Sequence, residues 1–178
     1  LQAETVGRQV GNNPLTLYAI TGSQNAMLQK LPQEKQYRAE WGMRMVHEIQ
    51  SSGGKLYDFV RQFGYGTDAV TVHNYWADEP VLSVAPPQVK WIALLKTRHP
   101  AKSSEDIPVL TDALIVLASW ATEDVKASVR FGPGRVGLLP EKLTFADAED
   151  GSAVDPAAVA LPGPYGVRVV RVTAAGQR

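Results

Sequence analysis

The sequence predicts an α+β fold: a mainly antiparallel β-sheet or sandwich over residues ~66–175, packed by an N-terminal helical pair over residues ~33–63. Two observations lead to it. Apolar residues before residue 66 recur with a helical period, whereas most later segments alternate with a period of two. Ten of the twelve prolines lie from Pro80 onward, where short turns containing proline or glycine leave little room for the crossover helices of a parallel sheet.

The first helix is expected over residues 33–50, up to the turn Ser51-Ser52-Gly53-Gly54. Its large apolar side chains recur every four residues: Tyr37, Trp41, Met45 and Ile49. A second helix follows, with one apolar stripe at positions i, i+3, i+4 and i+7: Leu56, Phe59, Val60 and Phe63. Gly64 stands where a left-handed C-terminal cap belongs, so this helix should end there.

Strands are expected at Leu15–Thr21, Asp68–Trp76, Gln88–Lys96, Val125–Phe131, Arg135–Leu139 and Tyr165–Thr173. The first should join the same sheet, and Gly132-Pro133-Gly134 should connect the fourth and fifth as a hairpin. The stretch Val109–Trp120 fits both a helix and a buried strand, and the turn-like Thr122-Glu123-Asp124 after it favours the strand. Residues 146–164, rich in small, acidic and proline residues, are expected to form a loop.

Two arginines of the last expected strand, Arg168 and Arg171, are three residues apart. In a regular strand they would fall on opposite faces. A β-bulge, or a place at the edge of the sheet, would resolve this conflict.

The length of 178 residues fits one domain. We expect a flexible N-terminal arm over residues 1–13 and a single α+β domain over residues 14–178. Eighteen basic and eighteen acidic side chains cancel, so the composition favours neither nucleic acid nor an anionic membrane surface. The longest apolar run, Ala113–Ala118, is too short to span a bilayer.

The chain has no cysteine, which excludes disulfides, thiolate metal sites and a cysteine nucleophile. This composition fits an exported or periplasmic bacterial protein, and it also fits a cytosolic one, so the compartment stays open. No cofactor is expected.

The turn Gly22-Ser23-Gln24-Asn25 follows an expected strand and precedes a helical pattern. Backbone N–H groups and the side chains of Gly22, Ser23, Gln24 and Asn25 at such a turn could bind a phosphate or carboxylate. Ser23 or Asn25 could equally be a simple helix N-cap, since no phosphate-binding motif is present. The segment LTLYAITGSQ resembles the first strand and turn of several α/β enzymes that act on nucleotides or sugars, a likeness too short to imply an activity.

His73 is the candidate for acid–base chemistry, with Asp68, Asp78 and Glu79 as nearby carboxylates. A single histidine on a strand is also an ordinary structural residue. The other two histidines, His47 and His99, are too scattered in the sequence to predict a metal site, and none is expected.

Arg130, Arg135, Arg168 and Arg171 are the candidate interaction residues, because a basic sheet face could receive an acidic protein partner. The same side chains could protect a sheet edge from aggregation. Our functional hypothesis is a non-enzymatic protein-interaction or assembly module, for example of a bacterial exported or toxin/immunity-type system. The alternative is a small enzyme or ligand-binding domain that acts on a phosphorylated or nucleotide-like molecule through Gly22–Asn25 and His73. The oligomeric state stays open.

Overall fold

The computed structural model describes residues 29–48, 54–98, 108–132 and 143–174. They contain helices α4 (Gln33–Val46) and α5 (Lys55–Phe63). The strands are β1 (Thr71–Asn74), β2 (Leu82–Ala85), β3 (Val89–Arg98), β4 (Val109–Ser119), β5 (Val125–Phe131), β6 (Leu143–Asp147), β7 (Val159–Leu161) and β8 (Val167–Ala174). Every strand pair is antiparallel, which confirms the α+β prediction.

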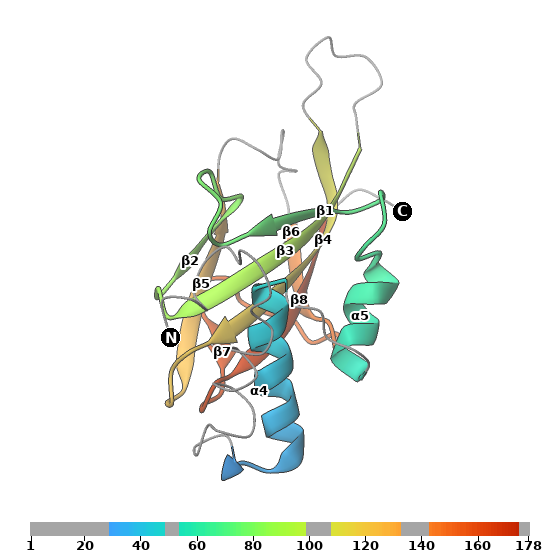
Figure 1. Cartoon of the computed structure of the whole chain (residues 1–178). Coiled ribbons are helices and arrows are strands. Elements are labelled where there is room, and N and C mark those ends of the chain that lie inside the picture. The colour runs from blue at the N-terminus through green and yellow to red at the C-terminus, as the bar shows by residue number, and fades with distance from the viewer. Residues whose placement is uncertain (1–28, 49–53, 99–107, 133–142, 175–178) are drawn as a thin grey trace.

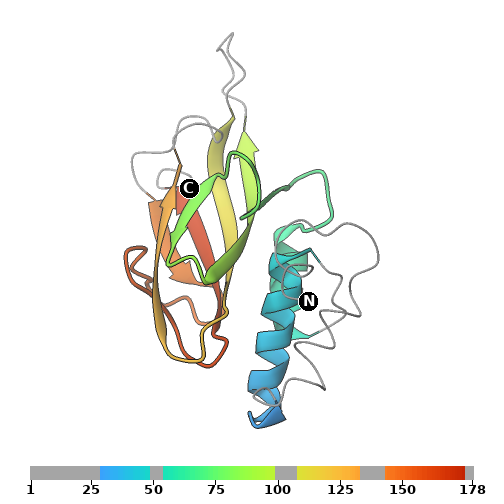
Figure 2. The ribbon, with the colours of Figure 1, turned by 60° about the vertical axis from the view of Figure 1, so that its left-hand side comes forward.

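The strands form two sheets, and the helices add a third layer (Figure 1). The larger sheet has the order β1-β3-β4-β8-β6, and the smaller one the order β2-β5-β7. Figure 2 shows the two helices together on one side of the strands. The larger sheet is therefore the middle layer, with one face toward the helices and one toward the smaller sheet.

The main hydrophobic core lies between the two sheets. Alternate residues of β5 supply it: Val125, Ala127 and Val129 are buried, whereas Lys126 and Arg130 are exposed. This is the alternation that the sequence predicted for Val125–Phe131. From the larger sheet, the same core takes alternate residues of β3, β4 and β8: Trp91, Ala93, Leu95, Ala113, Ile115, Leu117, Val170 and Val172.

A second core joins the helices to the other face of the larger sheet. Helix α5 buries Leu56, Val60 and Phe63 there, along the predicted stripe. The sheet supplies the remaining residues of β3, β4 and β8: Ile92, Leu94, Leu114, Val116, Ala118, Val167 and Val169. Strands β3 and β4 are consequently buried on both faces, and the stretch 109–120, which the sequence left open, is a strand.

The helix boundaries agree with the sequence in part. Helix α4 ends at Val46, four residues before the predicted end. Helix α5 ends as predicted, because Gly64 adopts a φ of 116° and its N–H donates to the carbonyl of Arg61. Trp41 and Met45 of the predicted stripe on α4 are buried, but Tyr37 is 38% exposed.

Three short strands were not predicted: β2, β6 and β7. Strands β6 and β7 fall at the two ends of the segment 146–164 that was expected to be a loop. Strand β8 was predicted, but it lies between β4 and β6, with no register shift against either neighbour. Neither the bulge nor the edge position proposed for its two arginines is therefore present.

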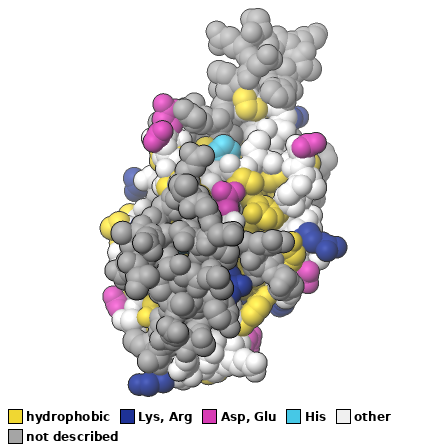
Figure 3. Space-filling model, viewed as in Figure 1, with side chains coloured by type: hydrophobic (Ala, Val, Ile, Leu, Met, Phe, Trp, Pro, Cys, Tyr) yellow, Lys and Arg dark blue, Asp and Glu magenta, His cyan; other side chains and the backbone are white. Residues whose placement is uncertain are grey.

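Several predictions lie outside the described residues: the arm 1–13, the strand Leu15–Thr21, the turn Gly22–Asn25, and the hairpin to Arg135–Leu139. None of the helices in the described ranges is both long and apolar enough to cross a membrane. On the face shown in Figure 3, described hydrophobic side chains gather near the middle, and charged side chains of both signs surround them.

Candidate functional site

Strand β1 forms one edge of the larger sheet and pairs only with β3 among the described strands. The N–H of Tyr75, the residue after β1, donates to the carbonyl of Trp91 at 3.3 Å. In an antiparallel ladder, residues whose backbone groups bond to the neighbouring strand alternate with residues whose backbone groups point away from it. Since Tyr75 bonds to β3, the backbone groups of Val72 and Asn74 point away from β3. The carbonyl of Asn74 accepts from the N–H of Ala77 at 3.2 Å. The Val72 N–H and C=O and the Asn74 N–H remain along the edge, and no described strand pairs with them.

His73 lies in the middle of this edge strand, and its Nε2 is 3.1 Å from the hydroxyl oxygen of Thr71. Asp68 precedes the strand, Asp78 and Glu79 follow it, and all three carboxylates are exposed. Within the described residues, neither Asp68 nor Asp78 pairs with His73. The structure therefore does not join His73 to either aspartate in the way that a histidine–carboxylate catalytic pair requires.

A different histidine, His47, occupies a more constrained site just after α4. It is buried, at 1% exposure. Its Nδ1 lies 2.7 Å from the carbonyl oxygen of Met43, and its Nε2 lies 3.0 Å from the hydroxyl of Tyr75. A carbonyl can only accept, so Nδ1 carries the proton and donates it, and Nε2 accepts from the tyrosine hydroxyl. Both nitrogens of a neutral imidazole are thereby satisfied.

Aromatic rings enclose this imidazole. The ring of Trp76 stacks on it with centroids 6.1 Å apart, and those of Tyr75 and Trp120 meet it edge-on at 5.7 Å. Burial in this cluster lowers the pKa of His47, the hydrogen bond to Met43 opposes the shift, and the positive charge of Lys90 adds to it. The cluster ties the end of α4 to the ends of β1 and β4 and keeps the imidazole from solvent.

The sequence analysis missed this cluster because His47 has no partner near it in the sequence that signals burial. Its ring partners come from the segments after β1 and after β4. The run Tyr75-Trp76, two large aromatics at the end of a strand, is the one local feature that could have pointed to it.

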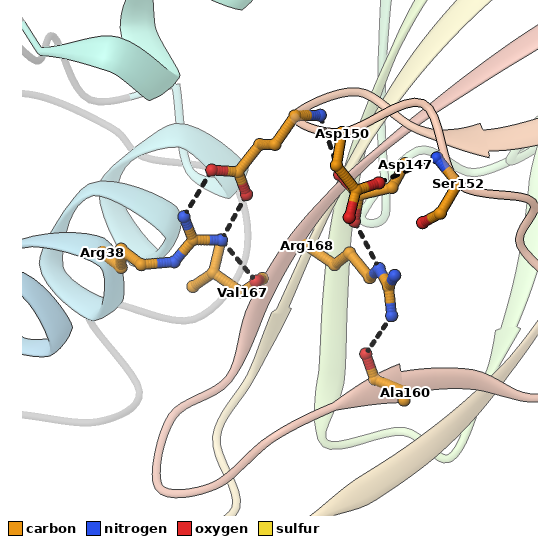
Figure 4. A network of polar contacts seen from close by, with 8 residues as sticks. Arg38, Asp147, Asp150, Ser152, Ala160, Val167 and Arg168 are labelled. Carbon is orange, nitrogen blue, oxygen red and sulfur yellow. Dashed lines mark hydrogen bonds and ion pairs between the residues drawn. The ribbon is translucent and has the colours of Figure 1, made fainter.

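A second polar network joins α4 to the loop after β6 (Figure 4). Arg38 of α4 donates to both carboxylate oxygens of Glu149, at 2.8 and 2.7 Å, and to the carbonyl of Val167 at 3.2 Å. This pairing lowers the pKa of Glu149 and raises that of Arg38. At the end of β6, next to this loop, Asp147 accepts from the Nε of Arg168 at 2.8 Å. These charges hold the loop against the helix and the sheet.

The candidate interaction residues lie in different places. Arg168 and Arg171 point to opposite faces of β8, and each meets a carboxylate there: Asp147 for the first and Asp112 for the second. Arg130 is exposed on the outer face of the smaller sheet. Arg135, like Gly22, Ser23, Gln24 and Asn25, lies outside the described residues. Among the residues that the structure describes, no group of three histidine or acidic side chains could hold a metal ion.

Comparison with known proteins finds no significant match to this chain among protein-family models, curated proteins or solved structures.

Proposed function

We propose that this chain is a non-enzymatic protein-interaction module that binds an extended segment of a partner protein along β1. The observation that supports this is the row of outward-facing backbone groups at Val72 and Asn74. A partner strand gains affinity from main-chain hydrogen bonds to such an edge, a mode known as β-augmentation. The short row suits a segment of about three or four residues, at about 3.4 Å of strand length per residue.

The other described edges are less suited to this role. Strand β6, at the far edge of the larger sheet, is followed by a loop that returns to it through a bridge between Ala146 and Ala153. In the smaller sheet, the edge strand β2 contacts β3 and the edge strand β7 contacts β8. Proteins commonly shield exposed edges in such ways, and β1 has no comparable cover among the described residues.

The end of β1 is held firmly. The Nδ2 of Asn74 donates to the carboxylate of Glu48 at 2.9 Å, and Tyr75 is bound to the buried His47. A strand fixed in this way loses little conformational freedom when a partner docks, which favours binding. The aromatic cluster then acts as the support of the edge.

Site-specific photo-crosslinking tests the proposal. A photoreactive residue at the exposed Thr71 should form one dominant adduct with a partner in extracts of the source cells, and the same residue at Ser83 on β2 should not. The Val72→Pro substitution removes an outward N–H and leaves the bonds to β3 in place, because proline is tolerated on the solvent side of an edge strand. It should abolish the adduct while leaving the circular dichroism spectrum nearly unchanged. Because Val72 also packs against the helix-facing core, the matched control is Val72→Ala, which loses the same packing but keeps the N–H and should keep the adduct.

Two results would contradict this function. One is an adduct that survives Val72→Pro in full, because the outward N–H would then have no part in binding. The other is equal crosslinking from Thr71 and Ser83, because the contact would then be unspecific.

A further inference from the structure

A hollow of about 320 Å³ opens between α5 and the helix-facing side of the larger sheet. Its walls come from five parts of the chain: α5, β3, β4, the segment after β6, and β8. They are formed by Phe59, Gln62, Phe63, Lys96, Leu114, Ala148 and Arg171. Helix α5 packs on the sheet through Leu56, Val60 and Phe63. Phe59 and Gln62 lie beside Phe63 and form the helix side of the hollow.

The charges around this hollow are unequal. Asp112 of β4 lies opposite Lys96 of β3, and both carboxylate oxygens of Asp112 accept from Arg171, at 2.8 and 3.3 Å. Arg171 is thus neutralised by its own partner. The Lys96 ammonium lies 4.4 Å from the centre of the Phe63 ring, and no carboxylate of the described residues pairs with it. One positive charge is left over at the wall of the hollow.

The lining also offers apolar surface beside the ammonium. It comes from the half-buried Phe59 and from the parts of the buried Phe63 and Leu114 that reach the hollow. The volume is about twice that of the ~150 Å³ engineered cavity that binds benzene. It also lies at the lower end of the range of about 300–1,000 Å³ that is typical of small-molecule sites. A ligand with one aromatic ring and a short charged substituent would fill the hollow.

We propose that this hollow binds a small organic carboxylate, with its apolar group against Phe59 and Leu114 and its carboxylate paired with Lys96. A monoanion is the favoured ligand, since it matches the single excess positive charge. The proposal is independent of the partner edge at β1.

Phenylacetate is the probe, and its binding is measured from the amide chemical shifts of the protein in NMR titrations at low salt. It should shift the amides of Phe63, Leu114 and Ala148. The Lys96→Gln variant should bind it about tenfold more weakly, as expected when a charge-assisted contact of about 1.4 kcal/mol is lost. The matched control Lys126→Gln, at an exposed lysine of the smaller sheet, should change the affinity less than about twofold. Phenylacetamide, which has the same shape without the charge, and acetate, which lacks the ring, should both bind much more weakly.

Two further peptides separate the possible sources of the carboxylate. A tetrapeptide ending in phenylalanine with a free C-terminus should bind more tightly than phenylacetate if the natural ligand is a chain terminus, and no more tightly if it is a free acid. The same tetrapeptide with an amidated C-terminus should not bind in either case.

The proposal would be refuted if phenylacetamide bound as tightly as phenylacetate, or if Lys96→Gln left the affinity unchanged. It would also be refuted if the chemical shift changes were confined to residues away from α5. The same holds if no shift appeared at about 10 mM ligand, because even a complex with a millimolar Kd would be populated at that concentration.

Discussion

Helix α4 approaches the sheet closely at Gly42, and replacing this glycine tests how the helix packs there. A β-carbon added there would lie 2.8 Å from the Cγ1 of Val167 and closer still to its Cγ2. Val167 is 6% exposed and sits on β8 between two paired strands, so it has no room to retreat. The substitution Gly42→Ala must therefore push the helix away from the sheet.

The expected cost follows from that displacement. Carbon atoms pack best at about 3.5–4.0 Å, so relief of the contact needs a shift of about 1 Å. Such a shift loosens the packing of Trp41 and Met45. Its cost in the free energy of unfolding should lie at the upper end of the ~1–3 kcal/mol range for overpacked cores. Alanine is favoured over glycine inside a helix by about 1 kcal/mol. The net loss in the free energy of unfolding should be about 2 kcal/mol.

Urea unfolding of the two single variants and the double variant measures this effect. Val167→Ala alone should destabilise through lost burial, but it also removes the two methyl groups that Gly42→Ala would meet. In the Val167→Ala background, Gly42→Ala should therefore cost nearly nothing, which gives a coupling energy of about 2 kcal/mol. The reasoning fails if Gly42→Ala is as stable as the parent, or if it costs the same in both backgrounds.

Two further predictions concern a buried histidine and a partly exposed ion pair. Folding lowers the pKa of His47, so the native state binds this proton less tightly than the unfolded chain does. The contribution of His47 to the free energy of unfolding should therefore be constant above about pH 6.5 and should fall as the pH drops below that value. The difference in melting temperature between the parent and His47→Gln should therefore shrink between pH 7.5 and pH 5, and a difference independent of pH would count against a buried neutral imidazole. For the pair Arg38–Glu149, a double-mutant cycle with Arg38→Met and Glu149→Gln should give a coupling energy of about 1 kcal/mol that decreases in 1 M salt, because both side chains are partly exposed. A coupling energy near zero would mean that the other contacts of the loop hold α4 without this pair.

The elements that the sequence predicted well carry their signal locally. Helix α5 has its complete apolar stripe and its glycine cap within ten residues, from Lys55 to Gly64. Strand β5 alternates because one of its faces meets the core and the other meets solvent. In both elements, a single period matches a single buried face.

The missed strands lack such a signal because they are short and lie near prolines. Strand β7 has three residues between Pro156 and Pro162, and its two buried side chains, Val159 and Leu161, are too few to establish a period. Composition alone assigns that segment to a loop. It is a strand because β5, its neighbour in the smaller sheet, offers backbone groups that pair with it, and this depends on the tertiary structure.

The arginines of β8 show the same limit for charge. Their spacing correctly placed them on opposite faces, and the inference that the strand must then be irregular or at an edge was wrong. A central strand accommodates both because Asp147 and Asp112 reach them from positions 21 and 59 residues away in the sequence. Paired and hydrogen-bonded, such partly buried charges cost little. Spacing along a strand determines on which face of the sheet an arginine lies. Only the tertiary structure determines whether a carboxylate lies close enough on that face to pair with it. For the same reason, the edge that we propose for partner binding is β1 and not the arginine-bearing β8, since the position of β1 at a sheet edge depends on the fold and not on its own side chains.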